Sequence, residues 1–318
     1  MKIGLIDVDG HHFPNLALMR ISAYHKQKGD DVEWWWSDLI HYDVVYMSKV
    51  FSDAYSPDMP EPMNADKVIK GGTGYAISLN EDGKEVFDKT KHEDLPPEVE
   101  GCFPDYSIYP QYNFAVAMTS RGCSRQCPFC HVVSKEGCVS VKVADVSDFW
   151  KRGGQPEIRV LDPNITGCRE KRELFRQYLD TGAVIDFTQG LDIRLLNSDD
   201  IDDINHMRLR TLHFAWDNPK DDLEPKFREF AQRFRRKNPG MVYILTNYDS
   251  TMEENLYRVY TLRDLGYDPY VMIYNKPSAP VEIRRLQYWV NDKVIFNVVR
   301  KFEDFHPEQR RKLNKKKG

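Results

Sequence analysis

A strand-like apolar stretch, Phe114-Ala-Val-Ala-Met118, leads directly into Thr119-Ser-Arg-Gly-Cys-Ser-Arg-Gln-Cys-Pro-Phe-Cys-His131. Within the second stretch Cys123, Cys127 and Cys130 have the spacing C-x3-C-x2-C. Iron–sulfur clusters are held by cysteine thiolates, usually four to a cluster. Three thiolates within eight residues therefore predict a [4Fe–4S] cluster in which the fourth iron is open to another ligand.

Two other interpretations of these cysteines stay open. Structural zinc usually takes four ligands in two pairs, and although His131 adjoins Cys130, no second pair follows at that spacing. Free cysteines also pack well without any ligand. We favour the cluster, because Gly122 and Pro128 suit the tight turn that three ligands on one face of a cube require.

Composition suits a soluble globular enzyme. The 318 residues suffice for one large or two ordinary domains, and 41% hydrophobic residues provide a core. The net charge of −4 gives no general attraction to nucleic acid. Because the chain has no membrane-length apolar run and no signal-peptide pattern, we expect no membrane association and a cytoplasmic location, where reduced thiols suit a cluster.

A basic run near the end is expected to form a solvated tail, and contact with RNA or DNA is the alternative. Its residues are Arg310, Arg311, Lys312, Lys315, Lys316 and Lys317.

The first part of the chain alternates strand-like and helix-like segments. Strands are expected at Ile3–Val8, Val32–Trp36, Val44–Met47 and Val68–Ile69, and a helix at Leu16–Lys28, ended by Gly29. Such alternation predicts a parallel sheet. Residues 1–95 are therefore expected to form a small Rossmann-like domain, and residues 96–112 a linker that continues the charged stretch Lys84–Pro97.

The second part repeats the alternation. Strands are expected at Phe114–Met118, Glu157–Leu161, Val184–Phe187, Thr211–Ala215, Met241–Leu245 and Pro269–Tyr274. Helices are expected between them at Val146–Lys151, Lys171–Leu179, Asp199–Met207, Phe227–Lys237 and Glu253–Leu265. Six strand units predict an α/β fold with a partial (β/α)6 TIM-type barrel over residues 113–280, followed by a helical cap, Val281–Phe305, in the C-terminal part 281–318.

The cysteine spacing, with Phe129 just before the third cysteine, resembles the radical S-adenosylmethionine (radical SAM) superfamily. The stretches Asp186-Phe-Thr-Gln-Gly-Leu-Asp-Ile-Arg194 and Gly266-Tyr-Asp-Pro-Tyr-Val-Met-Ile-Tyr274 are similar to radical SAM proteins of anaerobic bacteria and their phages. The resemblance implies the partial barrel and an oxygen-sensitive [4Fe–4S] cluster whose open iron binds S-adenosylmethionine. It also implies reductive cleavage of that molecule to a 5′-deoxyadenosyl radical, which takes hydrogen from a substrate, with flavodoxin or ferredoxin as electron donor.

Site residues are expected at the carboxyl ends of the barrel strands. The resemblance places Phe129 against the adenine of S-adenosylmethionine and Asp217 on its ribose. Candidates for further contacts with the cofactor follow the second and third strands: Asp162, Asn164, Gln189, Asp192 and Arg194. Arg194 suits a carboxylate because its guanidinium forms a bidentate fork, although a structural ion pair with Asp192 is an equal alternative.

Cys168 follows the second strand, where a thiol could give a hydrogen atom to a substrate radical, yet a loop cysteine without a role is the simpler interpretation. His11 and His12 follow the first strand of the chain, where α/β sheets bind ligands. Histidines bonded to the backbone are the favoured alternative.

The N-terminal domain resembles a shortened cobalamin-binding domain at Tyr42-Asp-Val-Val45 and Ala65-Asp-Lys-Val-Ile-Lys-Gly-Gly72. The D-x-H-x-x-G motif that supplies a histidine to cobalt is missing, since Asp7-Val-Asp-Gly-His-His12 does not match it. We therefore expect a vestigial or substrate-facing domain in preference to bound cobalamin.

The leading hypothesis is a radical SAM enzyme whose substrate is a small molecule, peptide or nucleic acid. A cobalamin-dependent radical SAM methylase is the nearest alternative, and a non-catalytic metal- or iron–sulfur-binding module is the alternative of another class.

Overall fold

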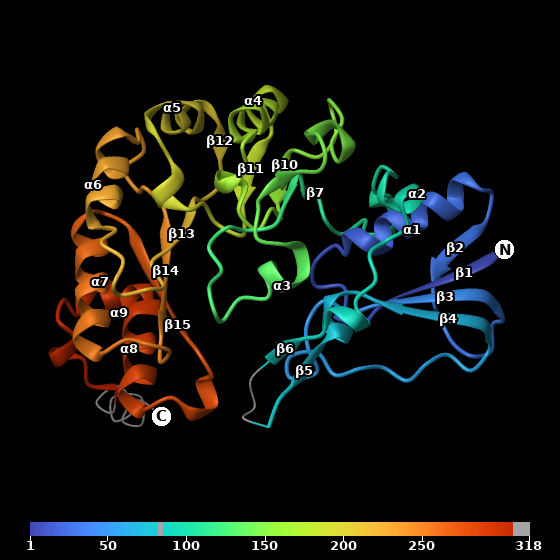
Figure 1. Cartoon of the computed structure of the whole chain (residues 1–318), viewed down its shortest axis with the longest axis horizontal. Helices are drawn as coiled ribbons and strands as arrows, with labels where there is room; N and C mark the ends of the chain where they lie inside the picture. Colours follow the sequence, from blue (N-terminus) through green and yellow to red (C-terminus); the bar gives the residue numbers. More distant parts are fainter. Residues whose placement is uncertain (82–84, 308–318) are drawn as a thin grey trace, which may run out of the picture. The chain divides into compact units, whose positions relative to one another are not determined.

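Parallel sheets form the framework of the chain, as Figure 1 shows. The computed structural model describes residues 1–81 and 85–307, and the basic run from Arg310 to Lys317 lies outside them. The chain divides into two units, Met1–Asp186 and Phe187–Gly318. The prediction of an α/β fold with parallel sheets is confirmed.

The first sheet of the N-terminal unit has the strand order β2-β1-β3-β4, with every neighbour parallel. Its strands are β1 (Lys2–Asp7), β2 (Asp31–Trp34), β3 (Tyr42–Ser48) and β4 (Ala65–Gly71). Helix α1 (Leu16–Gln27) connects β1 to β2, and the side chain of Asn15 caps it by accepting the Leu18 N–H at 3.2 Å. All five elements form where the sequence predicts them, with bounds shifted by a few residues.

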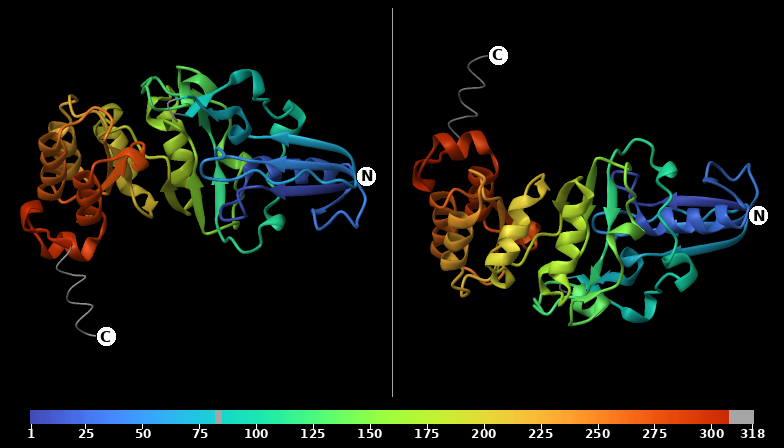
Figure 2. Two further views of the ribbon diagram at one scale, coloured as in Figure 1. Left: turned by 90° about the horizontal axis from the view of Figure 1, so that it is seen from below. Right: turned by 90° about the horizontal axis from the view of Figure 1, so that it is seen from above.

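Apolar side chains cover both faces of this sheet. On one face Ile3 and Leu5 pack with Leu18 and Met19 of α1, and Figure 2 shows the helix lying along the sheet. On the other face Val45 and Met47 form a separate cluster with their neighbours. Burial on both faces explains why the two central strands, β1 and β3, are rich in apolar residues, whereas the edge strands β2 and β4 carry charged ones.

Residues 96–112, expected as a linker, pack into this same core. They include α2 (Pro97–Glu100) and the buried residues Ile108 and Tyr109. The Trp34 Nε1–H donates to the Ile108 carbonyl at 3.1 Å, and the Tyr109 hydroxyl donates to the Asp7 carboxylate at 2.6 Å. The segment is therefore an integral part of the first unit. A short antiparallel hairpin, β5 (Ile77–Leu79) with β6 (Glu85–Phe87), precedes it.

The cysteine segment extends from a second sheet in the first unit, in which β7, β10 and β11 are neighbours. Their bounds are β7 (Ala115–Ala117), β10 (Glu157–Val160) and β11 (Val184–Phe187). Strands β7 and β10 are parallel, and α4 (Lys171–Thr181) connects β10 to β11.

The helix expected at Val146–Lys151 is absent from the structure, which has only a 3-10 turn at Val146–Asp148. Tertiary contacts explain the difference. The Phe149 ring is fully buried, and its carbonyl accepts the Tyr106 hydroxyl at 2.8 Å, which takes this backbone out of a helical path.

The second unit contains a parallel sheet of order β13-β14-β15. Along the chain, the α-helices and strands of this unit up to the last strand of that sheet are α5 (Ser198–His206), β12 (Arg208–Leu209), β13 (His213–Ala215), α6 (Glu224–Arg233), β14 (Met241–Thr246), α7 (Met252–Asp264) and β15 (Asp268–Ile273), and β12 is not part of the β13-β14-β15 sheet. Helices alternate with strands here as predicted.

The C-terminal helical stretch is two helices, α8 (Val281–Asn291) and α9 (Lys293–Val298), instead of one. Asp292 breaks it, because its side chain caps α9 by accepting the Ile295 N–H at 3.1 Å. Trp289 is fully buried, and its ring centroid lies 4.9 Å from that of Phe296. Among the residues described, none of the helices has the length and apolar character needed to cross a membrane.

Candidate cofactor site

The cysteine segment, called here the excursion, runs from residue 120 to residue 142, and two short strands at its ends pair with each other. Strands β8 (Ser120–Arg121) and β9 (Val141–Lys142) pair antiparallel, and α3 (Val132–Glu136) lies between them. All three cysteines of the motif lie on the loop that joins β8 to α3. The pairing therefore fixes both ends of the loop at the carboxyl end of β7.

Local backbone geometry explains the turn residues. Gly122 has a φ of +85°, and a Cβ there would lie 2.1 Å from the Val139 carbonyl oxygen, so no other residue fits. Gln126 has a φ of 51°, and the Cys130 N–H donates to the Cys127 carbonyl at 3.0 Å. The loop thus curls tightly between its second and third cysteines.

Two N–H groups point at the sulfur of Cys123. The Asn164 Nδ2–H donates to it at 3.4 Å, and the Arg125 backbone N–H donates at 3.5 Å. The orientation of the Asn164 amide is fixed, because its Oδ1 accepts from the Thr166 hydroxyl at 2.7 Å and from the Gly167 N–H at 3.1 Å. N–H donors of this kind stabilise thiolate charge and tune iron–sulfur clusters.

The three thiols of the motif are accessible to a cluster. Cys123 and Cys127 are half-buried and Cys130 is exposed, while Phe129 between the last two is half-buried. Three accessible thiols on a tight loop, with amide donors on one sulfur, fit an iron–sulfur cluster by donor type. Cys123, Cys127 and Cys130 would hold the cluster, and Asn164 would orient the first of them.

Asp162, predicted beside the cofactor, ties the end of β10 to the entrance of the cysteine loop. It is only 2% exposed, and its carboxylate accepts hydrogen bonds from the N–H and hydroxyl of both Thr119 and Ser120 at 2.6–2.8 Å. Burial raises the pKa of Asp162 from 3.8 to about 6, although these hydrogen bonds oppose the shift. The carboxylate thereby positions the strand that leads to Cys123.

Cys168 is buried in the turn that precedes α4. Burial raises the pKa of its thiol to about 11, so the group stays protonated at neutral pH. The thiol donates to the Glu170 carboxylate at 3.3 Å. It therefore keeps the S–H bond that hydrogen-atom donation would require.

The predicted residues after β11 lie in the second unit and interact with one another. Arg194 Nε and Asp192 Oδ1 are 2.6 Å apart, and Arg194 Nη1 lies 2.6 Å from Asp221 Oδ2. Burial would lower the pKa of Arg194, but its bonds and charge interactions with Asp192 and Asp221 outweigh burial and raise it. Gln189 is exposed on the loop before this pair. The Arg194–Asp192 ion pair that the sequence left as an alternative is present.

Asp217 follows β13 and is half-buried. Its carboxylate accepts the Leu245 N–H at 3.2 Å. Burial raises its pKa, opposed by the Leu245 bond and by the positive charges of Arg258 and Arg194.

Arg258 was not predicted from the sequence, yet it organises the strand ends in the second unit. This residue of α7 is fully buried and donates to the carbonyls of Trp216 at 2.6 Å, Asp217 at 2.9 Å and Leu245 at 3.2 Å. Its position on a helix face gives no signal in the sequence, because a buried arginine looks the same as an exposed one.

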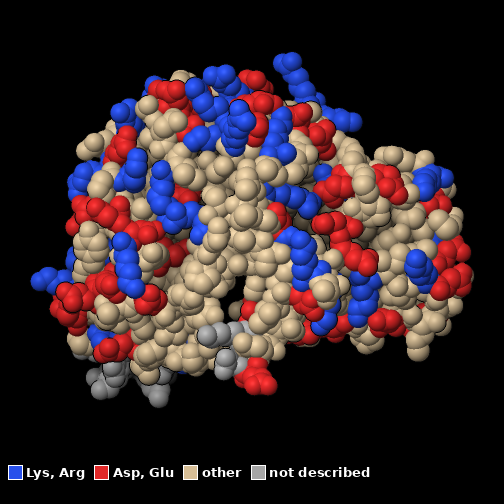
Figure 3. All heavy atoms as spheres, viewed as in Figure 1, with Lys and Arg blue, Asp and Glu red and all other residues tan. Residues whose placement is uncertain are grey.

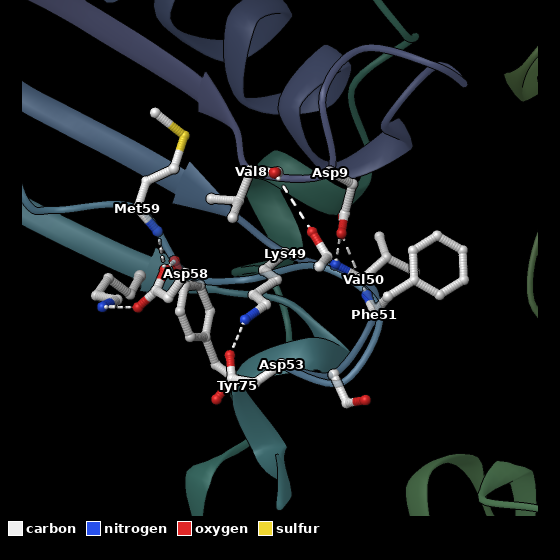
Figure 4. Close-up of polar contacts among 12 residues, drawn as sticks. Val8, Asp9, Lys49, Val50, Phe51, Asp53, Asp58, Met59 and Tyr75 are labelled. Atoms are coloured by element: carbon white, nitrogen blue, oxygen red, sulfur yellow. Dashed lines mark hydrogen bonds and ion pairs between the residues drawn. The ribbon is translucent and has the colours of Figure 1, made fainter. Parts of the chain in front are cut away.

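At the carboxyl edge of the first sheet, internal polar contacts occupy the space over β3 and β4 (Figure 4). Lys49 is almost fully buried, and its ammonium pairs with Asp53 and lies 5.6 Å from the centre of the Tyr75 ring. The Tyr75 hydroxyl donates to Asp58 at 2.8 Å, and the Val50 N–H donates to Asp9 at 2.6 Å. The side chains of this edge therefore bind one another.

His11 packs at the same edge. Its φ is 60°, its ring lies 4.2 Å from the Trp34 ring in an edge-on contact, and its carbonyl accepts the Tyr112 hydroxyl at 2.6 Å. His12 is exposed. The aromatic contacts explain the position of His11 through packing.

The comparisons with protein-family models and with curated proteins found no match for this chain. The function is therefore inferred from its residues and their geometry.

Proposed function

We propose that the chain is a radical SAM enzyme that holds a [4Fe–4S] cluster on Cys123, Cys127 and Cys130. One observation carries the proposal: the C-x3-C-x2-C loop follows β7 and the short strand β8, and Asn164, which lies just after the neighbouring strand β10, donates to the Cys123 sulfur at 3.4 Å. This is the place where barrel enzymes carry their chemistry. The bound cluster would supply the electron for reductive cleavage of S-adenosylmethionine.

The chain's own residues would prepare this site in three ways. Gly122 and the β8–β9 pairing hold the loop, and the Asp162 carboxylate fixes Thr119 and Ser120 at its entrance. We propose that Phe129 lies against the adenine of S-adenosylmethionine. Cys168 is a weaker candidate as hydrogen-atom donor: its thiol stays protonated, but the residue is only 3% exposed and would have to become accessible to a substrate radical.

Residues of the second unit complete the proposal. We propose that β7, β10, β11, β13, β14 and β15 form a partial barrel, with Asp217 on the ribose of S-adenosylmethionine and the guanidinium of Arg194 near its carboxylate. Arg194 already pairs with Asp192 and Asp221, so its guanidinium would have to bind the carboxylate of S-adenosylmethionine in addition to these two side chains. Gln189 remains a candidate contact, and flavodoxin or ferredoxin remains the proposed electron donor.

Cobalamin is not favoured in this proposal. The Lys49–Asp53 pair and the Tyr75–Asp58 hydrogen bond occupy the edge of the first sheet at which Rossmann-like domains bind ligands. A corrinoid there would have to displace a nearly buried lysine from its partner. We therefore expect no retained corrinoid after anaerobic reconstitution with cobalamin, and a corrinoid spectrum in the desalted protein would favour the methylase.

The test of the enzyme is formation of 5′-deoxyadenosine. Anaerobically reconstituted protein is reduced in the presence of S-adenosylmethionine, and the nucleoside is measured by chromatography. We expect it with the wild type and at least about a hundredfold less with Cys123→Ala, Cys127→Ala or Cys130→Ala, because removing one ligand disrupts the cluster. A wild type that binds and reduces its cluster but forms no 5′-deoxyadenosine would contradict the proposal.

A second candidate is a non-catalytic cluster with four thiolates, and Cys138 is the observation that favours it. Cys138 is exposed on the same excursion, and the carbonyl of the preceding Gly137 accepts the Cys123 N–H at 3.2 Å. A cluster with four thiolates leaves no open iron and suits electron transfer or structure. Cys138→Ala separates the two candidates: the radical SAM enzyme keeps its iron content and activity, whereas the four-thiolate module loses its cluster.

A further inference from the structure

Three potential metal ligands converge at the amino-terminal ends of β3 and β4. His41 and Asp43 are two residues apart and therefore share one face of the extended chain. The parallel register, Tyr42 beside Ala65 and Val44 beside Lys67, places Asp66 beside Asp43 on that face. Ligand atoms of His41, Asp43 and Asp66 all lie within 4.8 Å of one another. The adjoining strands thus bring together one imidazole and two carboxylates.

A neighbouring amide fixes the orientation of the imidazole. The Nδ2–H of Asn64 donates to the Asp38 carbonyl at 3.0 Å, so its Oδ1 faces His41 Nδ1, 3.2 Å away, and accepts that N–H. Nε2 of a neutral imidazole then directs its lone pair towards Asp66 Oδ2 at 3.5 Å. Two acceptors then face each other across this gap, a geometry that a cation bound between them would stabilise.

In most metal-bound histidines the ring nitrogen that does not bind the metal donates a hydrogen bond to an oxygen. The hydrogen bond from His41 Nδ1 to Asn64 Oδ1 is of this kind. Asp43 is also held, because its Oδ2 accepts the Lys2 N–H at 2.5 Å. The side chains of His41 and Asp66 are 56% and 67% exposed, so water can complete the coordination shell.

We propose that His41, Asp43 and Asp66 bind a divalent metal ion of the zinc type, with His41 Nε2 and one oxygen from each carboxylate as ligands. Imidazole nitrogen and carboxylate oxygen are ordinary zinc ligands, and Co²⁺ accepts the same set. The ion would cross-link β3 to β4 at the sheet edge opposite Lys49 and Asp9. Because it binds only the folded sheet, it would stabilise the first unit. The site uses none of the proposed cluster ligands.

Titration of the full chain with Co²⁺ alone tests the site. Cobalt on the cysteines gives an intense sulfur-to-metal charge-transfer band, whereas cobalt on nitrogen and oxygen ligands gives only weak visible bands, so the two sites are distinguished in one sample. We expect one weak-band Co²⁺ site in the wild type, loss of that site in His41→Ala, and at least about tenfold weaker binding in Asp66→Asn. His206→Ala, which removes another exposed histidine, should leave binding unchanged.

Asn64 acts as a positioning residue, and two readouts test that role. Asn64→Ala should weaken Co²⁺ binding by about tenfold. In imidazole ¹H–¹⁵N spectra without metal, His41 of the wild type should be the Nδ1–H tautomer, and Zn²⁺ should shift its Nε2 resonance. His41→Ala is judged only if its circular dichroism and melting in EDTA match the wild type.

Two results would overturn the proposal. Equal weak-band Co²⁺ binding by the wild type and a folded His41→Ala would mean an adventitious ion only. An Nε2 resonance that responds to pH but not to Zn²⁺ would mean that a proton alone bridges His41 and Asp66.

Discussion

Asp162 and Asp217 each follow a strand of a parallel sheet, one in each unit, and their surroundings differ. Asp162 is buried and accepts four hydrogen bonds from Thr119 and Ser120, so its carboxylate serves the fold. Asp217 is half-buried, and its carboxylate accepts the Leu245 N–H. The guanidinium of Arg258 donates to the backbone carbonyl of Asp217. Carboxylates that follow parallel strands in the two units therefore differ in accessibility, and Asp217 keeps an exposed part that a ligand could reach whereas Asp162 is buried.

The largest effect is expected from Arg258, which supports the Asp217 side of this comparison. Arg258→Met should lower the free energy of unfolding by about 3–5 kcal/mol, because buried carbonyls of Trp216, Asp217 and Leu245 lose their donor. Urea unfolding measures the change. Arg228→Met, on the exposed surface of α6, is the matched control and should stay within about 0.5 kcal/mol. Similar values for the two variants would show that Arg258 does not organise these strand ends.

Asp162→Ala should lower the free energy of unfolding by about 3 kcal/mol at neutral pH. The N–H groups of Thr119 and Ser120 lose their acceptor in a buried place. Urea unfolding followed by circular dichroism gives the value. A change below about 1 kcal/mol would mean that the hydrogen bonds of the Asp162 carboxylate do not stabilise the fold.

The pH dependence of the free energy of unfolding should distinguish Asp162 further from Asp217. Its pKa is about 6 in the folded chain against 3.8 for the free group, so the folded state holds the proton more tightly. This contribution to stability is fully present below about pH 4 and is lost as pH rises through 6, by about 3 kcal/mol. The stability difference between the wild type and Asp162→Ala should therefore shrink over this window.

The difference between these two proteins is the quantity to measure, because the raised pKa of Asp217 acts with the same sign in both and cancels. The difference in stability between Asp162→Asn and Asp162→Ala, neither of which titrates at this position, should show no such step. A difference that grows with pH would mean that hydrogen bonding to the carboxylate outweighs its burial.

The smallest effect on stability is expected from Asp217→Asn, within about 1 kcal/mol, because the amide keeps an acceptor for Leu245 and removes a partly buried charge. If Asp217 holds the ribose of S-adenosylmethionine, the same variant should bind that molecule about tenfold more weakly. Equilibrium dialysis of the reconstituted protein measures the affinity. Unchanged affinity would remove Asp217 from the proposed site.

Periodicity predicted most of the fold because apolar burial acts locally along the chain. Strand β11 has the predicted bounds, Val184–Phe187, and helix α7 lies within a residue of its prediction. The failures have tertiary causes. Tyr106 binds the backbone at Phe149 where a helix was expected, and Asp292 caps a new helix inside the Val281–Phe305 stretch.

The candidate site shows the same division. Spacing alone predicted the cysteines as a set, since their relation is local. The pairing of β7 with β10 brings Asn164 to Cys123 and brings Asp162 to Thr119 and Ser120. These contacts could not be predicted from spacing along the chain. The grouping of His41 and Asp43 with Asp66 needed the register of two strands.

The proposed enzyme requires one iron of the cluster to have no protein thiolate and to bind S-adenosylmethionine. Electron paramagnetic resonance of the reduced, reconstituted wild type, with and without S-adenosylmethionine carrying ¹⁷O in its carboxylate, tests it directly. We expect that added S-adenosylmethionine changes the g values and that ¹⁷O broadens the signal, in the wild type and in Cys138→Ala alike. A wild-type signal that S-adenosylmethionine leaves unchanged, together with loss of the cluster in Cys138→Ala, would contradict it.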